Sequence, residues 1–378
     1  MLKHALRYTP LLVLVLLLVP LRFYLAGNAS QPGQYPANPQ GNKLLSSGRS
    51  QELYGITGLP DGEAWAVGGI ETLEPTTHGN NGSIKIPSGG TILHFIDNSW
   101  AVEPVRGSLY QPLLSISLDS AQDGWAVGLA GTLVHYDGTR WSTRPGPTHL
   151  TQNLLSVKML SAQDGWAVGS SGTILHYDGK QWIDMQSPTT LDLHSIAFTS
   201  PEEGWAVGNS GTILHYHDGR WGLLHPTPTS QTLNAITMLS ADEGWIVGNQ
   251  GTILHDRNGS WESVHPAGYY QNPSGYQAGN FSMVAMSSLR SGWIAGDQHL
   301  LTYRSEAWIE APPIGDPLGI SSDTKLSNIS ITAMFLAPNG ASWAVGNVAL
   351  KDEKSTPDLG VILTYQAGSL RISKITGL

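Results

Sequence analysis

The stretch Gly165–Trp182 reads GWAVGSSGTILHYDGKQW, and nearly the same phrase recurs at Gly124–Trp141, Gly204–Trp221 and Gly244–Trp261. Within it, a Trp is followed by a small or apolar pair and then a Gly, and this shorter motif occurs seven times. Its tryptophans are Trp65, Trp125, Trp166, Trp205, Trp245, Trp293 and Trp343. Their spacings of 60, 41, 39, 40, 48 and 50 residues indicate one structural unit repeated with insertions.

A second tryptophan follows the first in six of the seven repeats, and Leu370 takes its place in the last. These six are Trp100, Trp141, Trp182, Trp221, Trp261 and Trp308. The two sets account for all 13 tryptophans of the 378-residue chain. The repeats therefore run from about Glu52 to Leu378, and we expect no second folded domain beside them.

Each repeat contains the pattern of four short strands. In the third repeat the apolar run Leu154–Leu160 precedes the turn SAQDG, and the very short strand WAVG follows. Gly172–Asp178 is the third strand, and Gln181–Gln186 follows a second turn as the fourth. Seven such units predict an all-β fold, a seven-bladed β-propeller of four-stranded antiparallel blades. An open β-solenoid is the alternative, but it does not need four turn signals per period.

Alternation along the second strand suggests how the blades pack. Trp166 and Val168 face one side of the blade, while Ala167 and Gly169 face the other. Each blade then has a bulky face and a small face, which lets neighbours nest around a ring. We therefore expect the tryptophans to be core residues rather than a ligand-binding platform.

The ends of the repeat array bear on how the ring closes. A first strand is expected near Glu52–Leu59 and a last strand near Ser369–Ile375. These two ends give each blade its own four strands, so no exchanged strand is expected unless Lys43–Ser47 supplies one.

The first thirty residues differ from the rest. Lys3 and Arg7 precede the uncharged apolar run Tyr8–Leu21, and small residues follow it, which is typical of a secretory signal peptide. The run reaches only about 21 Å as a helix, short of the ~30 Å hydrocarbon core of a bilayer. We expect residues 1–29 to be a signal peptide, or alternatively a retained membrane anchor, residues 30–50 a flexible linker, and residues 51–378 the propeller. Both alternatives place the propeller outside the cytoplasm, in a secreted, periplasmic or lumenal location.

Charge and cysteine content exclude several classes of function. The chain has 20 basic and 29 acidic residues, a formal net charge of −9, and no run of Lys or Arg. Nucleic acid is therefore not an expected partner, because phosphate binding needs a basic surface. The absence of cysteine excludes disulfides, thiolate metal sites and a cysteine nucleophile.

The phrase GWAVG-x-x-GTILH-x-DG-x-x-W resembles the repeat of the photosystem II stability/assembly factor propellers, and more widely of bacterial propellers with BNR or Asp-box-like repeats. The resemblance covers nearly all of the expected exported part. It implies a lumenal, non-enzymatic propeller that binds a newly made reaction-centre subunit through a basic patch. This chain departs from that pattern: it is acidic, its turns between Asp and Trp are one residue shorter than an Asp-box, and Arg140 and Arg220 fall in separate blades. We therefore expect no arginine cluster.

Two sets of polar residues recur at fixed positions of the repeat. The first set is a histidine in five repeats: His94, His135, His176, His215 and His255. Thr302 and Thr364 take its place in the last two repeats. Equivalent positions in different blades lie apart around a ring, so these side chains cannot meet at one ion. We expect them to make a structural hydrogen bond in each blade rather than a metal site. Turn residues Asp137, Asp178 and Asp218 are expected to cap their own turns. No metal and no cofactor is expected.

An enzymatic function is the less favoured interpretation. Sialidase-like propellers need an arginine cluster and a tyrosine nucleophile supported by a glutamate, and only eleven arginines are present. Glycoside hydrolysis in general needs two facing carboxylates, which a linear sequence cannot exclude. A glycan therefore remains a possible ligand. No phosphate-binding Gly-rich loop, metal-binding His pair or nucleophile-elbow motif occurs.

Four insertions point to a partner-binding face. In a four-stranded meander, the connections from second to third strand and from blade to blade lie on one face of the ring. The insertions fall in these connections, at Gly69–Gly89, Val264–Asn280, Ala311–Asn328 and Asn347–Leu359. Long loops on a rigid scaffold commonly carry binding. The candidate contact residues are Tyr269, Tyr270, Tyr276, His78, Asn80, Lys85, Lys351 and Asp352.

The sequence therefore predicts an exported, non-catalytic propeller that acts as a protein-binding or assembly scaffold. A monomer is expected, and the expected partner is a protein of the envelope or of a membrane. The alternative is a carbohydrate-binding or glycoside-cleaving propeller.

Overall fold

The computed structural model describes residues 49–75, 83–96, 99–266, 279–297, 299–311, 329–336, 342–348, 359–366 and 369–375. All of these residues belong to one compact unit, Gln40–Leu378. Within the described ranges, no helix is long and apolar enough to cross a membrane. The expected signal peptide or anchor and the segment 43–47 lie outside these ranges.

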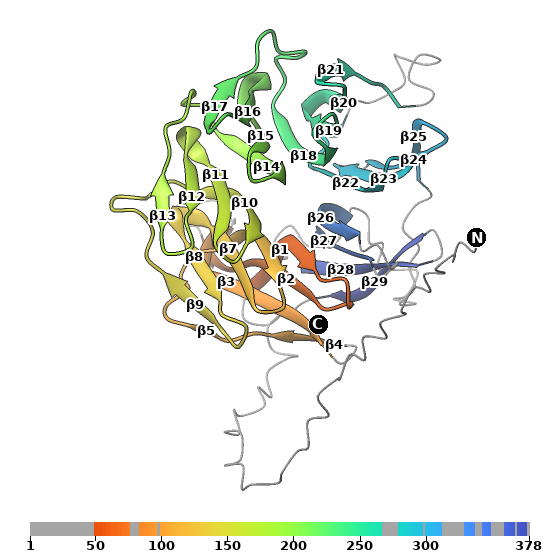
Figure 1. The fold of residues 1–378 in the computed structure, drawn as a ribbon. Helices are drawn as coiled ribbons and strands as arrows, with labels where there is room; N and C mark the ends of the chain where they lie inside the picture. The colour runs from red at the N-terminus through yellow and green to blue at the C-terminus, as the bar shows by residue number, and fades with distance from the viewer. Residues whose placement is uncertain are drawn as a thin grey trace, which may run out of the picture. The chain divides into compact units, whose positions relative to one another are not determined.

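The described unit is a seven-bladed β-propeller (Figure 1). Blade one contains β1 (Arg49–Gly58), β2 (Ala64–Pro75), β3 (Ser83–Ile96) and β4 (Ser99–Val102). Blade two contains β6 (Leu113–Ser120), β7 (Asp123–Gly128), β8 (Leu133–Tyr136) and β9 (Trp141–Arg144), with the short β5 (Val105–Arg106) added at its outer edge. Blade three contains β10 (Leu154–Ser161), β11 (Asp164–Gly169), β12 (Ile174–Tyr177) and β13 (Trp182–Asp184). Blade four contains β14 (Leu193–Ser200), β15 (Glu203–Gly208), β16 (Ile213–His217) and β17 (Arg220–Leu223).

The remaining three blades repeat the same antiparallel order of four strands. Blade five contains β18 (Leu233–Ser240), β19 (Glu243–Gly248), β20 (Ile253–Arg257) and β21 (Ser260–Ser263). Blade six contains β22 (Met283–Ser288), β23 (Ser291–Gly296), β24 (His299–Arg304) and β25 (Ala307–Glu310). Blade seven contains β26 (Ile329–Leu336), β27 (Ser342–Val348), β28 (Leu359–Gln366) and β29 (Ser369–Ile375). The predicted all-β propeller is thus confirmed.

The motif W-[AI]-[VA]-G lies in the second strand of each blade, and its glycine is required for steric reasons. In blade three the strand ends at Gly169, whose backbone is extended. A Cβ atom built on Gly169 would lie 1.9 Å from the carbonyl oxygen of Asn153, which precedes the innermost strand β10. No side chain fits there, so only glycine lets these two strands approach.

Neighbouring blades nest bulky face against small face, as the alternation along the strand predicts. Trp125 and Val127 of blade two pack on Ala167 of blade three and on its outer-strand Trp182. The two indole rings meet edge-on, with centroids 5.3 Å apart and planes at 89°. The seven anchor tryptophans are 1–7% exposed, which makes them core residues. Burial of each large apolar side chain stabilises the ring by roughly 2–3 kcal/mol.

The ring closes at a seam between blades seven and one, where β1 lies beside β28 (Figure 1). Blade one and blade seven each contain four strands of their own, so the described residues contain no exchanged strand. A single parallel bridge pairs Gln51 with Leu359. Trp343 of blade seven packs edge-on against Trp100 of blade one, with centroids 5.4 Å apart. The seam therefore uses the same aromatic contact as the junctions of blades two with three, three with four, and five with six.

The insertion of blade one differs from the expected loop. Its flanks extend β2 and β3 into a long hairpin, in which Leu73 pairs with Lys85 and Pro75 with Ser83. Residues 76–82 lie outside the described ranges. Alternating residues such as Ile84-Lys85-Ile86 suit a strand, so ladder pairing continues where a loop was predicted.

Candidate functional site

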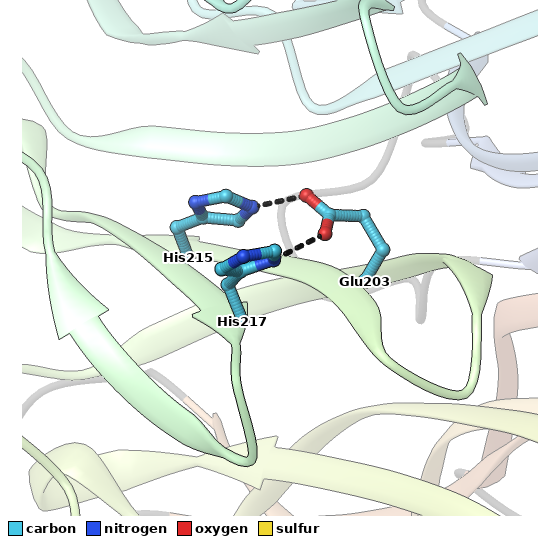
Figure 2. A group of neighbouring side chains, drawn as sticks. All are labelled: Glu203, His215 and His217. Atoms are coloured by element: carbon cyan, nitrogen blue, oxygen red, sulfur yellow. Dashed lines mark hydrogen bonds and ion pairs between the residues drawn. The ribbon is translucent and has the colours of Figure 1, made fainter.

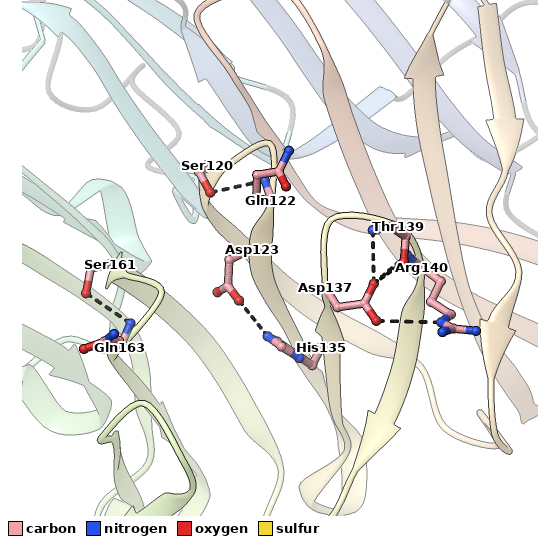
Figure 3. A network of polar contacts seen from close by, with 9 residues as sticks. All are labelled: Ser120, Gln122, Asp123, His135, Asp137, Thr139, Arg140, Ser161 and Gln163. Carbon is pink, nitrogen blue, oxygen red and sulfur yellow. Dashed lines mark hydrogen bonds and ion pairs between the residues drawn. The ribbon is translucent and has the colours of Figure 1, made fainter. Parts of the chain in front are cut away.

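The five repeat histidines each hold a carboxylate and lie against the anchor tryptophan of their own blade. In blade two, His135 Nε2 lies 2.8 Å from Asp123 Oδ2, and its ring centroid is 4.6 Å from that of Trp125. Figure 3 shows this His135–Asp123 pair between the turn of Ser120 and Gln122 and the turn of Asp137, Thr139 and Arg140. The same arrangement joins His176 to Asp164 at 2.9 Å. The predicted structural hydrogen bond is confirmed.

The carboxylate partner was missed from the sequence, although the repeats carry a signal for it. An acidic residue lies two positions before the tryptophan in every repeat that has the histidine: Glu63, Asp123, Asp164, Glu203 and Glu243. The two repeats with Thr302 and Thr364 have Ser291 and Ala341 there instead. Acid and histidine are therefore present together or absent together. His94 is the exception in geometry, since its Nδ1 lies 3.0 Å from Glu103 of its own blade and its Nε2 3.8 Å from Glu63.

The turn aspartates cap their turns in two blades and not in the third. Asp137 Oδ1 accepts hydrogen bonds from the backbone N–H groups of Thr139 and Arg140, both at 3.0 Å (Figure 3). Asp178 accepts the equivalent pair at 2.9 Å. Asp218 was assigned the same role, and this was wrong. It is one position later in its repeat, so it lies inside a two-residue turn at φ +50° and contacts His217 instead.

An arginine cluster lies at the outer edge of blade two, contrary to the prediction of scattered arginines. Arg106 from β5, Arg140 from the third-to-fourth-strand turn and Arg144 from β9 are all exposed and line one pocket. The pocket has a volume of about 520 Å³ and is completed by Gly107, Asp137, Ser142 and Thr143. Three guanidinium groups at one place form a cationic site on an acidic protein.

The short strand β5 brings Arg106 to this pocket. It pairs in parallel with β9, with Val105 opposite Trp141 and Arg106 opposite Ser142. The chain then turns at Gly107 with φ +101°, and a Cβ atom there would lie 2.2 Å from Thr143 Oγ1. Glycine is therefore required both by its backbone conformation and by the close approach to β9.

Asp137 offsets part of the pocket's positive charge. The hydrogen bond from the Thr139 hydroxyl, assisted by the backbone bonds and by Arg140, lowers the pKa of Asp137 to about 2, against a weaker opposing effect of burial. The ionised carboxylate lies 3.7 Å from Arg140 Nε. This pair is exposed and contributes little to stability. Arg106 and Arg144 leave the pocket with a net positive charge, which suits a carboxylate or another planar anion.

Most of the predicted contact residues cannot be placed. Tyr269, Tyr270, Tyr276, His78, Asn80, Lys351 and Asp352 lie outside the described residues. Lys85 lies on β3, opposite Leu73. The arginine pocket is therefore the site that the described residues define, and it is built from a different part of the ring.

The fold and this site place the protein among seven-bladed propellers, with a cationic pocket on one blade. The sequence model of the family described as photosynthesis system II assembly factor YCF48 matches residues 77–178 and 177–269, about half of the chain. The chain belongs to this family. A search of curated proteins found no match.

Solved structures agree on the fold. A structure described as YCF48 bound to D1 peptide is similar at 18% identity and a TM-score of 0.58, covering 82% of this chain and 94% of that one. YCF48 from Cyanidioschyzon merolae is similar at 15% identity and a TM-score of 0.56, covering 80% and 97%. The WD40 propeller domain of Doa1 is similar at 12% identity and a TM-score of 0.57, covering 82% and 97%. At these identities the likeness concerns the fold.

Proposed function

We propose that this protein is an exported, non-catalytic propeller that binds a segment of a membrane or envelope protein and assists its assembly. The observation that carries the proposal is the arginine pocket of blade two, in a chain whose family relative was solved with a peptide bound. Export is inferred from the basic, apolar and small-residue order of the first thirty residues.

The pocket's chemistry favours a carboxylate-bearing polypeptide segment as the ligand. Guanidinium groups bind carboxylates through paired N–H donors, and a chain terminus or an acidic side chain offers that group. The neighbouring Ser142 and Thr143 hydroxyls can donate to the same ligand. A pocket with an exposed charged rim and few apolar walls suits a transient partner better than a small-molecule substrate.

Binding is favoured over glycoside cleavage by the residues around the pocket. Within the described part of the chain, the lining of this pocket includes neither a tyrosine nor a glutamate. A sialidase-like mechanism requires both beside its arginines. Asp137 is the one carboxylate there, and it is engaged by its own turn. A pocket of this composition can hold an anionic group but lacks the pair of carboxylates that hydrolysis needs.

The proposal is tested by site-specific photo-crosslinking in the source cells. A photo-reactive amino acid replaces Ser142, which lines the pocket, and in a matched control replaces Ile183. These residues occupy the same register position, opposite His135 in blade two and opposite His176 in blade three. We expect one dominant membrane or envelope protein to crosslink at position 142 and not at position 183.

A charge variant decides whether the arginines are responsible. The double substitution Arg140→Ala and Arg144→Ala should abolish the crosslink at position 142 while the melting temperature stays unchanged. An undiminished crosslink in this variant, or equal crosslinking at both positions, would overturn the assignment of the pocket. Export is tested separately by cell fractionation and N-terminal sequencing. A chain that is found only in the cytoplasm with its initial residues intact would contradict it.

The insertion-bearing face remains a second prediction. Replacing Val264–Asn280 by a short blade connection should spare folding and abolish partner binding if that face contributes to the interface. Unchanged binding would leave blade two as the binding surface.

A further inference from the structure

Blade four has a second histidine, two positions after the repeat histidine, and no other blade has a histidine at that position. His217 follows His215 by two positions on β16, so both side chains lie on the same face of the strand. The equivalent residue is Asp178 in blade three and Arg257 in blade five. The repeat's ordinary histidine–carboxylate pair has become a group of three.

The three side chains converge on one point. His215 Nε2 hydrogen-bonds Glu203 Oε1, and His217 Nδ1 lies 2.9 Å from Glu203 Oε2 (Figure 2). The two imidazole rings are stacked, with centroids 5.7 Å apart and planes at 21°. One donor atom from each residue lies within 4.8 Å of the other two.

Neighbouring groups hold the two rings in the orientation that a metal ligand needs. The ring of His215 stacks on Trp205, with centroids 4.9 Å apart and planes at 18°. The other nitrogen of His217, Nε2, lies 3.4 Å from Asp218 Oδ1. A carboxylate beside the far nitrogen is the usual support of metal-binding histidines, and Nδ1 is the nitrogen that faces Glu203. The left-handed turn at Asp218 thus places its carboxylate behind His217.

From this geometry we propose that Glu203, His215 and His217 form a binding site for a divalent transition-metal ion of the zinc type. Two imidazoles and one carboxylate are a common ligand set for Zn²⁺, and imidazole favours Zn²⁺, Cu²⁺ or Ni²⁺ over Mg²⁺ and Ca²⁺. Tetrahedral Zn²⁺ with bonds of about 2.0–2.1 Å separates its ligand atoms by roughly 3.3 Å. The ligand atoms now lie within 4.8 Å of one another, so binding of Zn²⁺ would draw them together.

Exposure also suits an ion. The side chain of His217 is 60% exposed and that of Glu203 is 19% exposed, so the ion can enter from solvent and keep a water or a partner's ligand in an open position. Arg220 pairs with His217 in the register of β16 and β17, and its side chain is exposed to solvent.

Blade five has the same histidine–carboxylate pair but no second histidine, so it serves as a comparison for the proposed metal site. There Arg257 takes the place of His217, and its Nε donates to Nδ1 of His255 at 3.0 Å. This places a guanidinium beside His255, where blade four has a second imidazole. The variant His217→Arg therefore converts the blade-four group into a native arrangement of the same fold.

Calorimetric titration of the full chain, purified without a histidine tag, with ZnCl₂ tests the site. We expect one saturable site per chain, unchanged in the control His149→Asn, which removes another exposed histidine at a left-handed position. His217→Arg should abolish the site, and Asp218→Asn should weaken it about tenfold. Zn²⁺ should also raise the melting temperature of the unmodified chain but not that of His217→Arg.

Two outcomes overturn the proposal. One is an unmodified chain that gives no stoichiometric heat with Zn²⁺. The other is a His217→Arg variant that folds normally and binds Zn²⁺ as tightly as the unmodified chain, which would place the ion elsewhere. Because the readout is metal binding, neither outcome depends on the partner-binding function proposed above.

Discussion

The junction between blades two and three and the seam between blades seven and one solve the same packing problem with different polar contacts. In both, an anchor tryptophan meets the next blade's outer tryptophan edge-on, at 5.3 Å for Trp125 and Trp182 and 5.4 Å for Trp343 and Trp100. At the ordinary junction, a serine hydroxyl accepts from the next blade's innermost strand, as Ser115 does from Val157 N at 3.2 Å.

The seam instead uses larger side chains to hold both backbone groups of Leu53. Asn347 Oδ1 accepts from Leu53 N at 2.9 Å, and the Thr332 hydroxyl donates to Leu53 O at 2.8 Å. The apolar contact is therefore a property of the repeat, whereas the polar contacts are adapted to the place where the first and last blades meet.

The largest expected effect comes from removing an anchor tryptophan. Trp166→Ala should lower the free energy of unfolding by about 3–5 kcal/mol, because it leaves a cavity between blades three and four. Trp343→Ala at the seam should cost the same within about 1 kcal/mol if the apolar contact is equivalent there. Urea denaturation of both variants measures this, and a much smaller cost at Trp343 would mean that the seam is packed more weakly.

A smaller effect is expected from the polar contacts. Asn347→Ala leaves the backbone N–H of Leu53 without its partner and should cost about 1–3 kcal/mol. Ser115→Ala at the ordinary junction removes one hydrogen bond, from Val157 N, whereas Asn347→Ala removes two with Leu53, so the serine variant should cost less, about 1 kcal/mol. The same denaturation experiment compares them, and equal costs would contradict a seam that depends more on its polar contacts.

Blade five departs from the regular blades at Asp256, which takes the place of a tyrosine and is 1% exposed. Burial raises the pKa of Asp256, chiefly by desolvation, despite the N–H of Gly259. The folded state therefore binds this proton more tightly than the unfolded state, so stability should rise as pH falls through the raised pKa. Unfolding measured from pH 7.5 down to the ordinary value of 3.8 should reveal this gain.

Asp256→Asn should remove that part of the pH dependence and be at least as stable as the unmodified protein at pH 7.5. The difference in free energy of unfolding between Asp256→Asn and the unmodified protein at pH 7.5 should be smaller than the ~1–3 kcal/mol that a buried polar group without a hydrogen-bond partner costs. A pH profile that is identical in the two proteins would show that Asp256 does not titrate differently on folding.

The smallest effect belongs to the turn of blade two. Because the pKa of Asp137 is lowered to about 2, its turn contacts should persist as pH falls and weaken only near that value. An NMR titration of the Asp137 carboxyl should give a midpoint near 2 rather than near the ordinary 3.8. Thr139→Val, which removes the first of its hydrogen bonds, should move the midpoint upward.

The parts of the fold that could be predicted are those set by local sequence. The last strand, Ser369–Ile375, was predicted with the same bounds that the structure has, because turn residues and alternation determine both. The two faces of W-A-V-G followed from strand periodicity alone. The positions of the first and last strands predicted that blades one and seven each have four strands of their own, which the described residues show.

The parts that were missed depend on contacts between distant segments or on register. Arg106 reaches Arg140 and Arg144 only because β5 pairs with β9, and nothing local in the sequence specifies that parallel pairing. Asp218 was misassigned because the Asp-Gly pair of blade four lies one residue later than in blades two and three. His217 therefore occupies the position at which those blades have the capping aspartate. The zinc-type group arises from that same shift.

The seam between blades seven and one also has a kinetic consequence. Among the described strands, the four of each blade follow one another in the chain, so six junctions join segments that are near one another in sequence, whereas the contact of Asn347 with Leu53 spans 294 residues. Contacts of such long range form late, because closing a long loop costs entropy before any contact compensates it. During synthesis, blade one must keep one apolar face uncovered until blade seven arrives. The small face of blade one, around Ala64 and Ala66, is therefore where a chaperone would be needed longest.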